Sequence, residues 1–200
     1  MSEKKKQKIL DAASECFAKF GYKKTTLDDI GEKIGLNKAS LYYYFKNKEE
    51  IFTTIVINEV EKYIKEVHSS AEENVECEEQ LFNYFVQRLS FLNDSIVVQQ
   101  ITEIEPEKLQ LLIESGQSVL MKLYLEDKAF LSKLLNKCIE NGRIQDCDVE
   151  KVGTYLFGLV DGIKHNAKGF FSTKKFSQSE YESVLQDIRA ALKIFINGLK

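Results

Sequence analysis

The segment TTLDDIGEKIGLNKASLYYYFKNKEE, residues 25–50, is the part of the sequence that is most informative about the fold. Its apolar residues recur at helical spacing. Leu27, Ile30 and Ile34 occupy positions i, i+3 and i+7, and Leu41 and Phe45 lie four residues apart. Gly35 stands between the two sets, where a positive φ angle favours a residue without a Cβ. The stretch predicts two short helices joined by a glycine turn, which is the pattern of a helix-turn-helix DNA reader.

Polar residues suited to cap a helix precede each predicted helix. Thr26 stands before the first helix with Asp29 at its third position, and Asn37 stands before the second. Asn47, followed by Glu50 three residues later, resembles a capping box and predicts the start of a third, longer helix.

The second predicted helix leaves an ammonium group, a hydroxyl and three phenols facing outward, and such groups bond phosphate oxygens and base edges. Together with two flanking residues, the predicted DNA-binding set is Thr26, Lys38, Ala39, Ser40, Tyr42, Tyr43, Tyr44 and Lys48. No arginine precedes Arg88, which excludes a bidentate arginine–guanine contact from this region. Lys38, Ser40 and Tyr43 are therefore the candidates for base contacts.

This segment closely resembles the DNA-binding domain of the tetracycline-repressor (TetR) family, whose pattern is T-x-x-x-I-A, then G-V-S-x-G-T-L-Y-x-Y-F, then x-S-K-E-x-L. The matching positions in this chain are Thr26, Ile30, Gly35, Leu36, Ser40, Leu41, Tyr42, Tyr44, Phe45, Lys48, Glu49 and Ile51. Gly31 departs from the pattern, where alanine is usual, at a cost in helix propensity of about 1 kcal/mol. The resemblance implies an operator-binding homodimer, usually a repressor, with C-terminal helices that dimerise and enclose a ligand cavity.

The composition predicts an all-α chain of about nine helices. Only one proline (Pro106) and ten glycines occur in 200 residues, too few turn residues for a sheet protein of this size. We expect an N-terminal three-helix helix-turn-helix domain at residues 1–47 and a C-terminal helical ligand-sensing and dimerisation domain at residues 48–200. Residues 1–50 carry a net charge of +3 and the remainder −6, which suits a DNA reader with a separate regulatory domain; ordinary surface charge explains it equally well.

Helical periodicity and cap residues place the elements beyond this stretch. The predicted helices span residues 4–20, 48–70, 81–92, 96–104, 109–113 merging into 119–139, 149–163 and 177–199. The helix at 48–70 would join the DNA reader to the rest of the chain, and we expect it to act as a lever.

The chain shows no sequence signal for a membrane, a metal or a cofactor. The basic start lacks a following apolar segment, and no run of about 18 apolar residues occurs, so we expect a cytoplasmic protein without membrane contact. Four separated cysteines without a C-x-x-C pair (Cys16, Cys77, Cys138 and Cys147) predict reduced thiols. Two isolated histidines, His68 and His165, indicate no metal site.

The last two predicted helices have the wide apolar stripes of bundle helices. We predict that they pair with their copies in a homodimer through Leu156, Leu159, Ile163, Ile188, Leu192 and Phe195. Gly158 and Gly162 would allow close approach of helices. Packing of both helices within one monomer remains the alternative.

A candidate ligand site follows from the resemblance, which implies a cavity among the middle helices. The residues predicted to line it are Phe82, Phe85, Arg88, Leu89, Met121, Tyr124, Phe157 and Asp161. Their apolar and aromatic content favours an apolar or amphipathic ligand, and Arg88 could pair with an anionic one. Ordinary core packing accounts for the same aromatic pattern.

The predicted function is a homodimeric repressor that a small apolar or amphipathic ligand releases from double-stranded operator DNA. The chain has no G-x-S-x-G elbow, phosphate-binding glycine loop or H-E-x-x-H motif, so we do not expect an enzyme. Three alternatives remain open: a DNA-binding regulator without a small-molecule effector, control by a protein partner, and a helix-turn-helix unit that binds protein instead of DNA.

Overall fold

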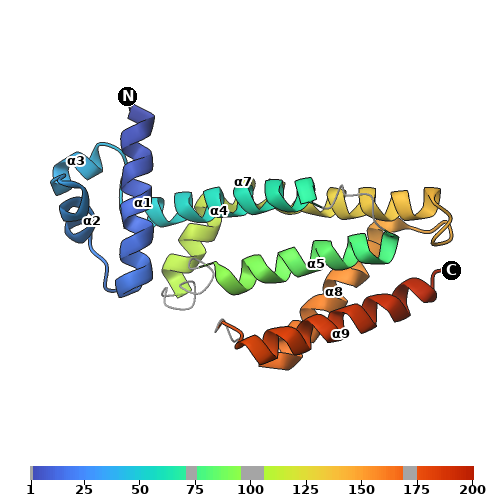
Figure 1. The fold of residues 1–200 in the computed structure, drawn as a ribbon. Helices are drawn as coiled ribbons and strands as arrows, with labels where there is room; N and C mark the ends of the chain where they lie inside the picture. Colours follow the sequence, from blue (N-terminus) through green and yellow to red (C-terminus); the bar gives the residue numbers. More distant parts are fainter. Residues whose placement is uncertain (1, 71–75, 96–105, 169–174) are drawn as a thin grey trace. The chain divides into compact units, whose positions relative to one another are not determined.

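The described part of the chain is entirely helical, which confirms the predicted all-α class (Figure 1). The computed structural model describes residues 2–70, 76–95, 106–168 and 175–200. Its helices are α1 (Ser2–Phe20), α2 (Leu27–Ile34), α3 (Lys38–Tyr42), α4 (Lys48–Ser70), α5 (Cys77–Asp94), α7 (Pro106–Glu140), α8 (Val149–Lys168) and α9 (Gln178–Asn197). The short helix predicted at residues 96–104 lies outside the described residues. Within the described ranges, no helix is both long and apolar enough to cross a bilayer.

The chain forms two compact units. Unit 1 comprises residues 1–61 and 95–121, and unit 2 comprises residues 62–94 and 122–200. Both α4 and α7 pass from one unit into the other along the chain. The expected domain boundary at residue 48 coincides with the start of α4, but the first turns of α4 belong to unit 1.

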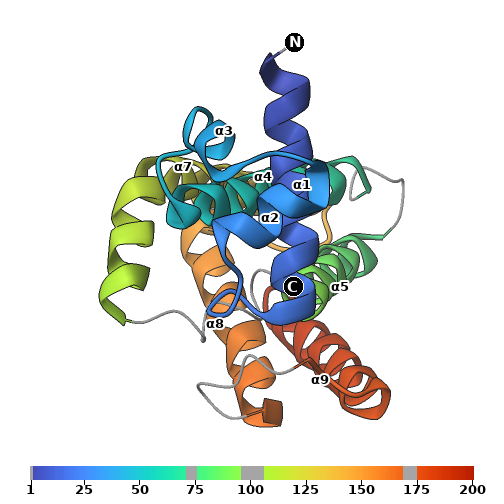
Figure 2. The same cartoon turned by 90° about the vertical axis from the view of Figure 1, so that its left-hand side faces the viewer.

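Unit 1 is built on the helix-turn-helix pair. Helix α1 packs on α2, and α2 packs on α3 (Figure 2). The apolar positions of all three helices, together with the first turns of α4, form one core, whose fully buried members include Ile9, Ala13, Ile30, Leu41 and Ile51. Since the start of α4 supplies Ile51, Phe52 and Ile55 to this core, the fourth helix is fixed to the DNA reader by apolar packing.

The predicted caps and the glycine turn are present. Thr26 caps α2, with its hydroxyl accepting from the Asp29 amide at 3.2 Å while the Asp29 carboxylate accepts from the Thr26 amide at 2.7 Å. Gly35 ends the helix with a φ of 68°, a left-handed conformation that favours glycine. A Cβ added at Gly31 would lie 2.3 Å from the Leu36 carbonyl oxygen, so glycine at this position lets the turn pass close to α2.

Unit 2 is a bundle in which α5 packs on α9 and α9 packs on α8 (Figure 1). Its core contains side chains with no exposed surface on each of four helices: Leu81, Tyr84, Phe85, Leu131, Leu135, Leu156, Ile188 and Leu192. The helix at 109–113, predicted to merge into the one at 119–139, does so in the single helix α7, with Pro106 at its first position, where proline is well tolerated.

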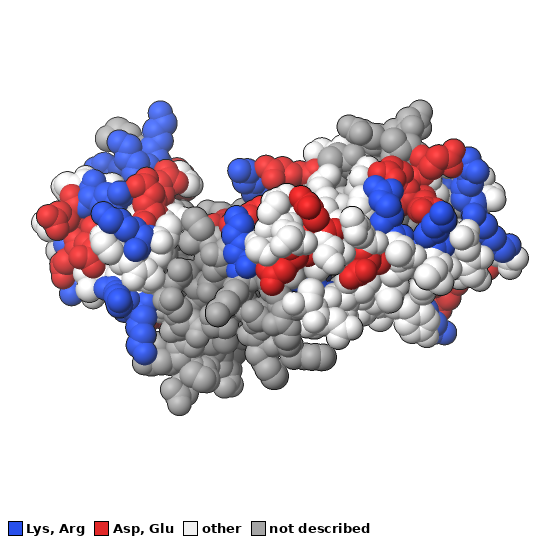
Figure 3. All heavy atoms as spheres, turned by 60° about the horizontal axis from the view of Figure 1, so that its bottom comes forward, with Lys and Arg blue, Asp and Glu red and all other residues white. Residues whose placement is uncertain are grey.

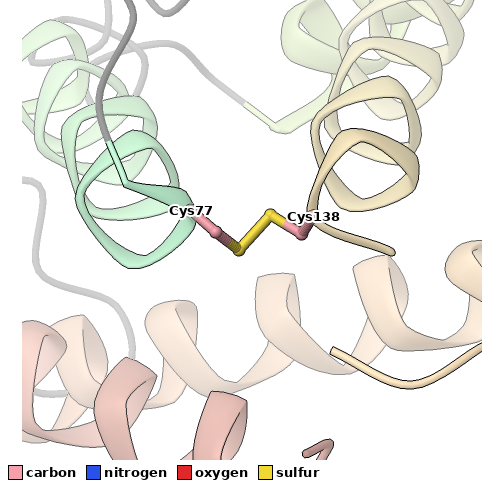
Figure 4. The surroundings of a disulfide bond; sticks show 2 residues. All are labelled: Cys77 and Cys138. Carbon is pink, nitrogen blue, oxygen red and sulfur yellow. A yellow bond between two sulfur atoms is a disulfide. The ribbon is translucent and has the colours of Figure 1, made fainter. Parts of the chain in front are cut away.

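A disulfide bond joins Cys77, the first residue of α5, to Cys138 near the end of α7 (Figure 4). The expectation of reduced thiols is therefore wrong for this pair, whereas Cys16 and Cys147 are free. The two Cα atoms lie 5.4 Å apart, within the usual range for a disulfide. Because 61 residues separate the two cysteines in sequence, only the packing of α5 against α7 reveals the pairing.

Candidate functional site

The cap and the core of unit 1 fix the orientation of α3. Asn37 accepts through Oδ1 from the Ser40 amide at 2.8 Å and from the Ser40 hydroxyl at 2.9 Å. Leu41 is completely buried and Phe45 is 2% exposed. With its cap on one side and its apolar side chains in the core, α3 presents its remaining side chains outward.

Those outward side chains are the phenols and the ammonium group predicted from the sequence. Tyr43 is 81% exposed and Tyr42 is 52% exposed. Lys38 is half-exposed and lies 3.6 Å from the exposed carboxylate of Asp28. Tyr44 is half-buried, and its ring meets that of Tyr43 edge to face at 5.0 Å. An exposed ion pair of this kind is weak, so Lys38 can exchange Asp28 for a phosphate at little cost.

The other members of the predicted DNA-binding set differ in how exposed they are and in the hydrogen bonds that they already make. Ala39 is exposed and Ser40 is half-buried beside the cap of α3. Thr26 is exposed, but its hydroxyl also donates to the Asp29 carboxylate at 2.7 Å. This bond, with the one from the Thr26 amide, holds the pKa of Asp29 below its usual value. DNA contact by these residues stays a prediction.

Lys48 has a structural role within unit 1. Its ammonium group donates to the carbonyl oxygens of Tyr22 and Thr25, each at 2.8 Å, and lies 4.4 Å from the centre of the Tyr22 ring. These partners belong to the turn between α1 and α2, so the side chain is directed into unit 1. A phosphate contact of Lys48 stays a prediction, and it would have to compete with these bonds.

The turn that binds Lys48 is also held by aromatic packing. The Tyr22 ring lies 4.8 Å from that of Phe52 and 5.5 Å from that of Phe17, and its hydroxyl donates to Glu49 at 3.2 Å. The first turn of α4 thus contacts the α1–α2 turn through a cation, a carboxylate and an aromatic ring. Any movement of α4 at this end would break these contacts.

Basic and acidic side chains are mixed on the face drawn in Figure 3. Neither sign dominates a large area of that face. Affinity for a polyanion would therefore depend on local groups such as Lys38, and not on a broad basic field over this face.

A second candidate site is a buried polar cluster in unit 2. Asp127 of α7 is 3% exposed and accepts from the Tyr84 hydroxyl at 2.8 Å and from the Arg88 guanidinium at 2.5 Å. The guanidinium also lies 4.6 Å from the centre of the Phe157 ring on α8. Arg88 and Phe157 were both predicted to line the ligand site, and the Phe157 ring also lies 6.0 Å from that of Phe85, another predicted member.

Two buried phenols in this cluster were not predicted. Burial, reinforced by the negative charge of Asp127, raises the pKa of Tyr84 and of Tyr63 well above the usual value. Tyr63 of α4 is 8% exposed and its ring stacks on Phe91 at 4.4 Å. Its hydroxyl has no partner of good hydrogen-bond geometry among the described residues, although the Arg88 side chain lies near enough to oppose the rise in its pKa. A buried phenol with so weak a contact can still bond a ligand or water.

Of the remaining predicted ligand residues, only Asp161 lies near enough to the cluster to act on Arg88. Met121 and Tyr124 are about half exposed, at 51% and 49%, so they are not enclosed within a single chain, and their place in a ligand site stays a prediction. Phe82 packs under the guanidinium of Arg189 at 3.6 Å, in the α5–α9 contact. Asp161 pairs with Lys164 at 3.3 Å. Leu89 is 2% exposed and is a core residue. Amphipathic spacing identified apolar faces but not which neighbour each face meets.

The predicted dimer residues also need correction. Leu156, Ile188 and Leu192 have no exposed surface within a single chain, so they have none to offer a partner. Leu159, Ile163 and Phe195 are half-buried. The outward apolar side chains of these helices are instead Tyr155, 60% exposed, and Ile194, 74% exposed. A Cβ at Gly158 or Gly162 would meet nothing within 4 Å, so both glycines also face open space.

Comparison with known proteins agrees with the helix-turn-helix geometry. The family model described as "Bacterial regulatory proteins, tetR family" matches residues 9–55, which span α1 to the start of α4. Residues 9–55 therefore form a helix-turn-helix domain of the tetR family of bacterial regulatory proteins.

Similarity to two known regulators extends beyond the helix-turn-helix domain. The uncharacterised HTH-type transcriptional regulator YhgD of Bacillus subtilis is 28% identical over 80% of this chain and 82% of its own length. The fatty acid metabolism regulator protein of the same organism is 26% identical over 78% and 80%. The crystal structure of FadR from Bacillus subtilis in complex with stearoyl-CoA superposes with a TM-score of 0.62 at 19% identity, covering 97% and 99% of the two chains. That likeness shows a shared fold.

Proposed function

We propose that this protein is a homodimeric repressor that reads a palindromic operator through α3 and is released by a small apolar or amphipathic ligand bound in unit 2. One observation carries the DNA-binding part. On a single five-residue helix, Leu41 is fully buried while Tyr42 and Tyr43 are 52% and 81% exposed. Exposed large aromatics on a rigidly capped element are costly in water and suit a binding surface.

The chemistry of this face fits duplex DNA. Lys38 can pair with a phosphate, and the Tyr42 and Tyr43 hydroxyls can bond phosphate oxygens or base edges. Ala39, between them, is small enough to permit close approach of the backbone. The absence of arginine before Arg88 means that guanine is read, if at all, by lysine or hydroxyl groups.

The dimer follows from the symmetry of the site that such a reader needs. Two recognition helices reach successive major grooves, about 34 Å apart, only when two copies are joined. The outward stripe of α8 is suited to this, because Tyr155, Gly158 and Gly162 recur at helical spacing and the two glycines have open space above them. A second copy would bury Tyr155 and would bring backbones close at the glycines.

The effector part rests on the buried polar cluster. Tyr63 offers a buried hydroxyl whose one neighbouring polar side chain, that of Arg88, makes no well-formed hydrogen bond to it, next to the aromatic and apolar side chains of unit 2. The Bacillus subtilis fatty acid metabolism regulator and the FadR complex with stearoyl-CoA make a long-chain acyl-CoA the first compound to test. An apolar tail would occupy the aromatic region, and a polar group would meet Tyr63.

A second candidate is a regulator without a small-molecule effector. Arg88, the arginine that was predicted to meet an anionic ligand, is already paired with Asp127 and stacked on Phe157. Because Asp127 already compensates the buried guanidinium charge, no anionic ligand is required to stabilise it.

Selection from a randomised 30-base-pair duplex library tests the proposal. The expected product is a two-fold symmetric sequence bound by two chains, as native mass spectrometry of the complex would show. Stearoyl-CoA should then raise the melting temperature and release the selected duplex. Enrichment of no sequence would contradict DNA reading; a symmetric sequence unaffected by acyl-CoA would favour the second candidate.

A further inference from the structure

The disulfide between Cys77 and Cys138 has no role in DNA reading or in the proposed ligand site. Both cysteines are buried within unit 2, at 7% and 1% exposure. A protein that works on DNA, as the proposed function requires, shares a compartment with thiol reductants, where disulfides are mostly transient, catalytic or sensing. The fold therefore keeps two thiols close enough for the disulfide to form on oxidation and to break on reduction.

We propose that Cys77 and Cys138 form a reversible redox-sensing site that reacts with hydroperoxides and changes the packing around α5, α7 and α4. Cys77 is the better placed to react first. It has the larger exposed fraction, and it begins α5, where the partial positive charge of a helix start favours the thiolate. Small oxidants such as hydrogen peroxide suit a sulfur that is 7% exposed.

The chemistry balances with hydrogen peroxide as the only co-reactant. The Cys77 thiolate attacks one peroxide oxygen, the O–O bond breaks, and protonation of the leaving hydroxide gives water and a Cys77 sulfenic acid. The Cys138 thiolate then attacks the sulfenic sulfur, forms the S–S bond and displaces the hydroxyl as a second water. Two thiols lose two electrons and two protons, and one peroxide becomes two waters. A thiol reductant reverses the bond by exchange.

The junction around the bond keeps other links that persist when it is reduced. Arg143, just after α7, pairs with Glu76, just before α5, at 2.6 Å, and its amide donates to the Cys138 carbonyl at 2.9 Å. Both side chains of this ion pair are more than half exposed, so the pair is weak. Loss of the disulfide would thus loosen the junction without separating the helices.

Two contacts lead from the junction to the rest of the protein. Phe130 lies eight residues before Cys138 on α7 and stacks on His68 of α4 at 3.9 Å. Helix α4 continues from there to the DNA reader. On α5, Glu79 receives both guanidinium nitrogens of Arg189, at 2.6 and 3.1 Å, and this links α5 to α9. A shift of either end of the disulfide therefore acts on α4 and on α9.

The experiment counts thiols in the full-length protein and measures DNA binding in both redox states. After treatment with hydrogen peroxide or with dithiothreitol, the protein is denatured and labelled with a maleimide. We expect two adducts after peroxide and four after reductant, since the chain has four cysteines. The oxidised protein should melt roughly 10 °C higher. Its affinity for the selected duplex should differ from that of the reduced protein by roughly fivefold or more.

The matched control is Cys147→Ser, which removes a free, half-buried thiol. This variant should keep the change in adduct number and the change in DNA affinity between the two redox states, whereas Cys77→Ser and Cys138→Ser should lose both. If a variant fails to fold, the comparison of oxidised with reduced wild type still tests the proposal. Four adducts after peroxide, a bond that resists dithiothreitol in the folded protein, or a reversible bond without change in DNA affinity would each overturn the redox-sensing role. Failure to bind any duplex in either state would instead overturn the proposed function, while the adduct count still decides whether the thiol pair cycles.

Discussion

The ammonium group of Lys48 lies 2.8 Å from the carbonyl oxygen of Thr25, 23 residues earlier in the chain. Together with the equal bond to Tyr22, this contact fastens the first turn of α4 to the turn that precedes α2. Lys48, whose position in the family pattern suggested a phosphate contact, therefore stabilises the helix-turn-helix domain. Measurements of stability and of DNA binding can distinguish this structural role from a phosphate contact.

We expect Lys48→Ala to lower the free energy of unfolding by about 2 kcal/mol, because two hydrogen bonds from a charged, partly buried donor are lost. Urea denaturation measures this. Lys48→Met keeps most of the apolar stem of the side chain and should lose less. The slope of log affinity against log salt should stay as in the wild type. A slope smaller by about one would show that Lys48 does contact a phosphate.

Asp127→Ala should lower the free energy of unfolding by about 3–5 kcal/mol, because it leaves the Arg88 guanidinium largely buried without its carboxylate. Replacing both partners, as Arg88→Met with Asp127→Leu, should cost clearly less. Glu66→Ala, which removes an exposed ion pair with Lys62, is the control and should change stability by less than about 1 kcal/mol. Equal losses in the single and double variants would contradict this account.

Stability should fall as the pH rises above about 10. Below that pH, Tyr63 and Tyr84 are protonated in both states; above it, the unfolded chain releases protons that the folded protein retains, because burial raises the folded-state pKa values. Tyr84→Phe should therefore flatten the decline by up to about 1.4 kcal/mol per pH unit. Tyr124→Phe, a change at a half-exposed tyrosine, should leave the slope unchanged. Urea unfolding at pH 9, 10 and 11 compares the variants, and identical slopes would disprove the assignment.

Local patterns allowed the helix-turn-helix pair to be predicted almost completely. The caps at Thr26 and Asn37 and the turn at Gly35 depend on residues three to five positions away, so their chemistry is visible in the sequence. The role of Lys48 was missed because its acceptors are backbone carbonyls far back in the chain. Every residue has a backbone carbonyl, so the residue types do not indicate which carbonyls accept a hydrogen bond.

Unit 2 shows the limit of periodicity. An apolar stripe predicts that a helix face is covered but not whether its own chain or a partner covers it, which is why Leu156 and Ile188 were assigned to the dimer. The Tyr84–Asp127 bond joins positions 43 residues apart, and the disulfide joins positions 61 apart. Such pairs depend on how helices pack, and spacing within one helix contains no information on them.

The revised dimer face predicts that Tyr155→Asp gives monomers with an unchanged fold, since Tyr155 is 60% exposed within one chain. A desolvated carboxylate without a partner would oppose association. Light scattering measures the mass, and circular dichroism checks the helices. Tyr124→Asp on α7 is the matched control and should behave as the wild type does. A Tyr155→Asp protein of unchanged mass would place the interface elsewhere.

The central claim, that the outward side of α3 reads DNA, is tested most directly by salt titrations of binding to the selected duplex. Lys38→Ala should weaken binding and reduce the salt slope by about one per contacted phosphate, and Tyr43→Ala should weaken binding about tenfold, or ~1.4 kcal/mol. Lys62→Ala removes a still more exposed lysine that also pairs with a carboxylate, and it should match the wild type. If Lys38→Ala and Tyr43→Ala bind as tightly as Lys62→Ala does, with the same salt slope, α3 does not contact the DNA and the account is wrong.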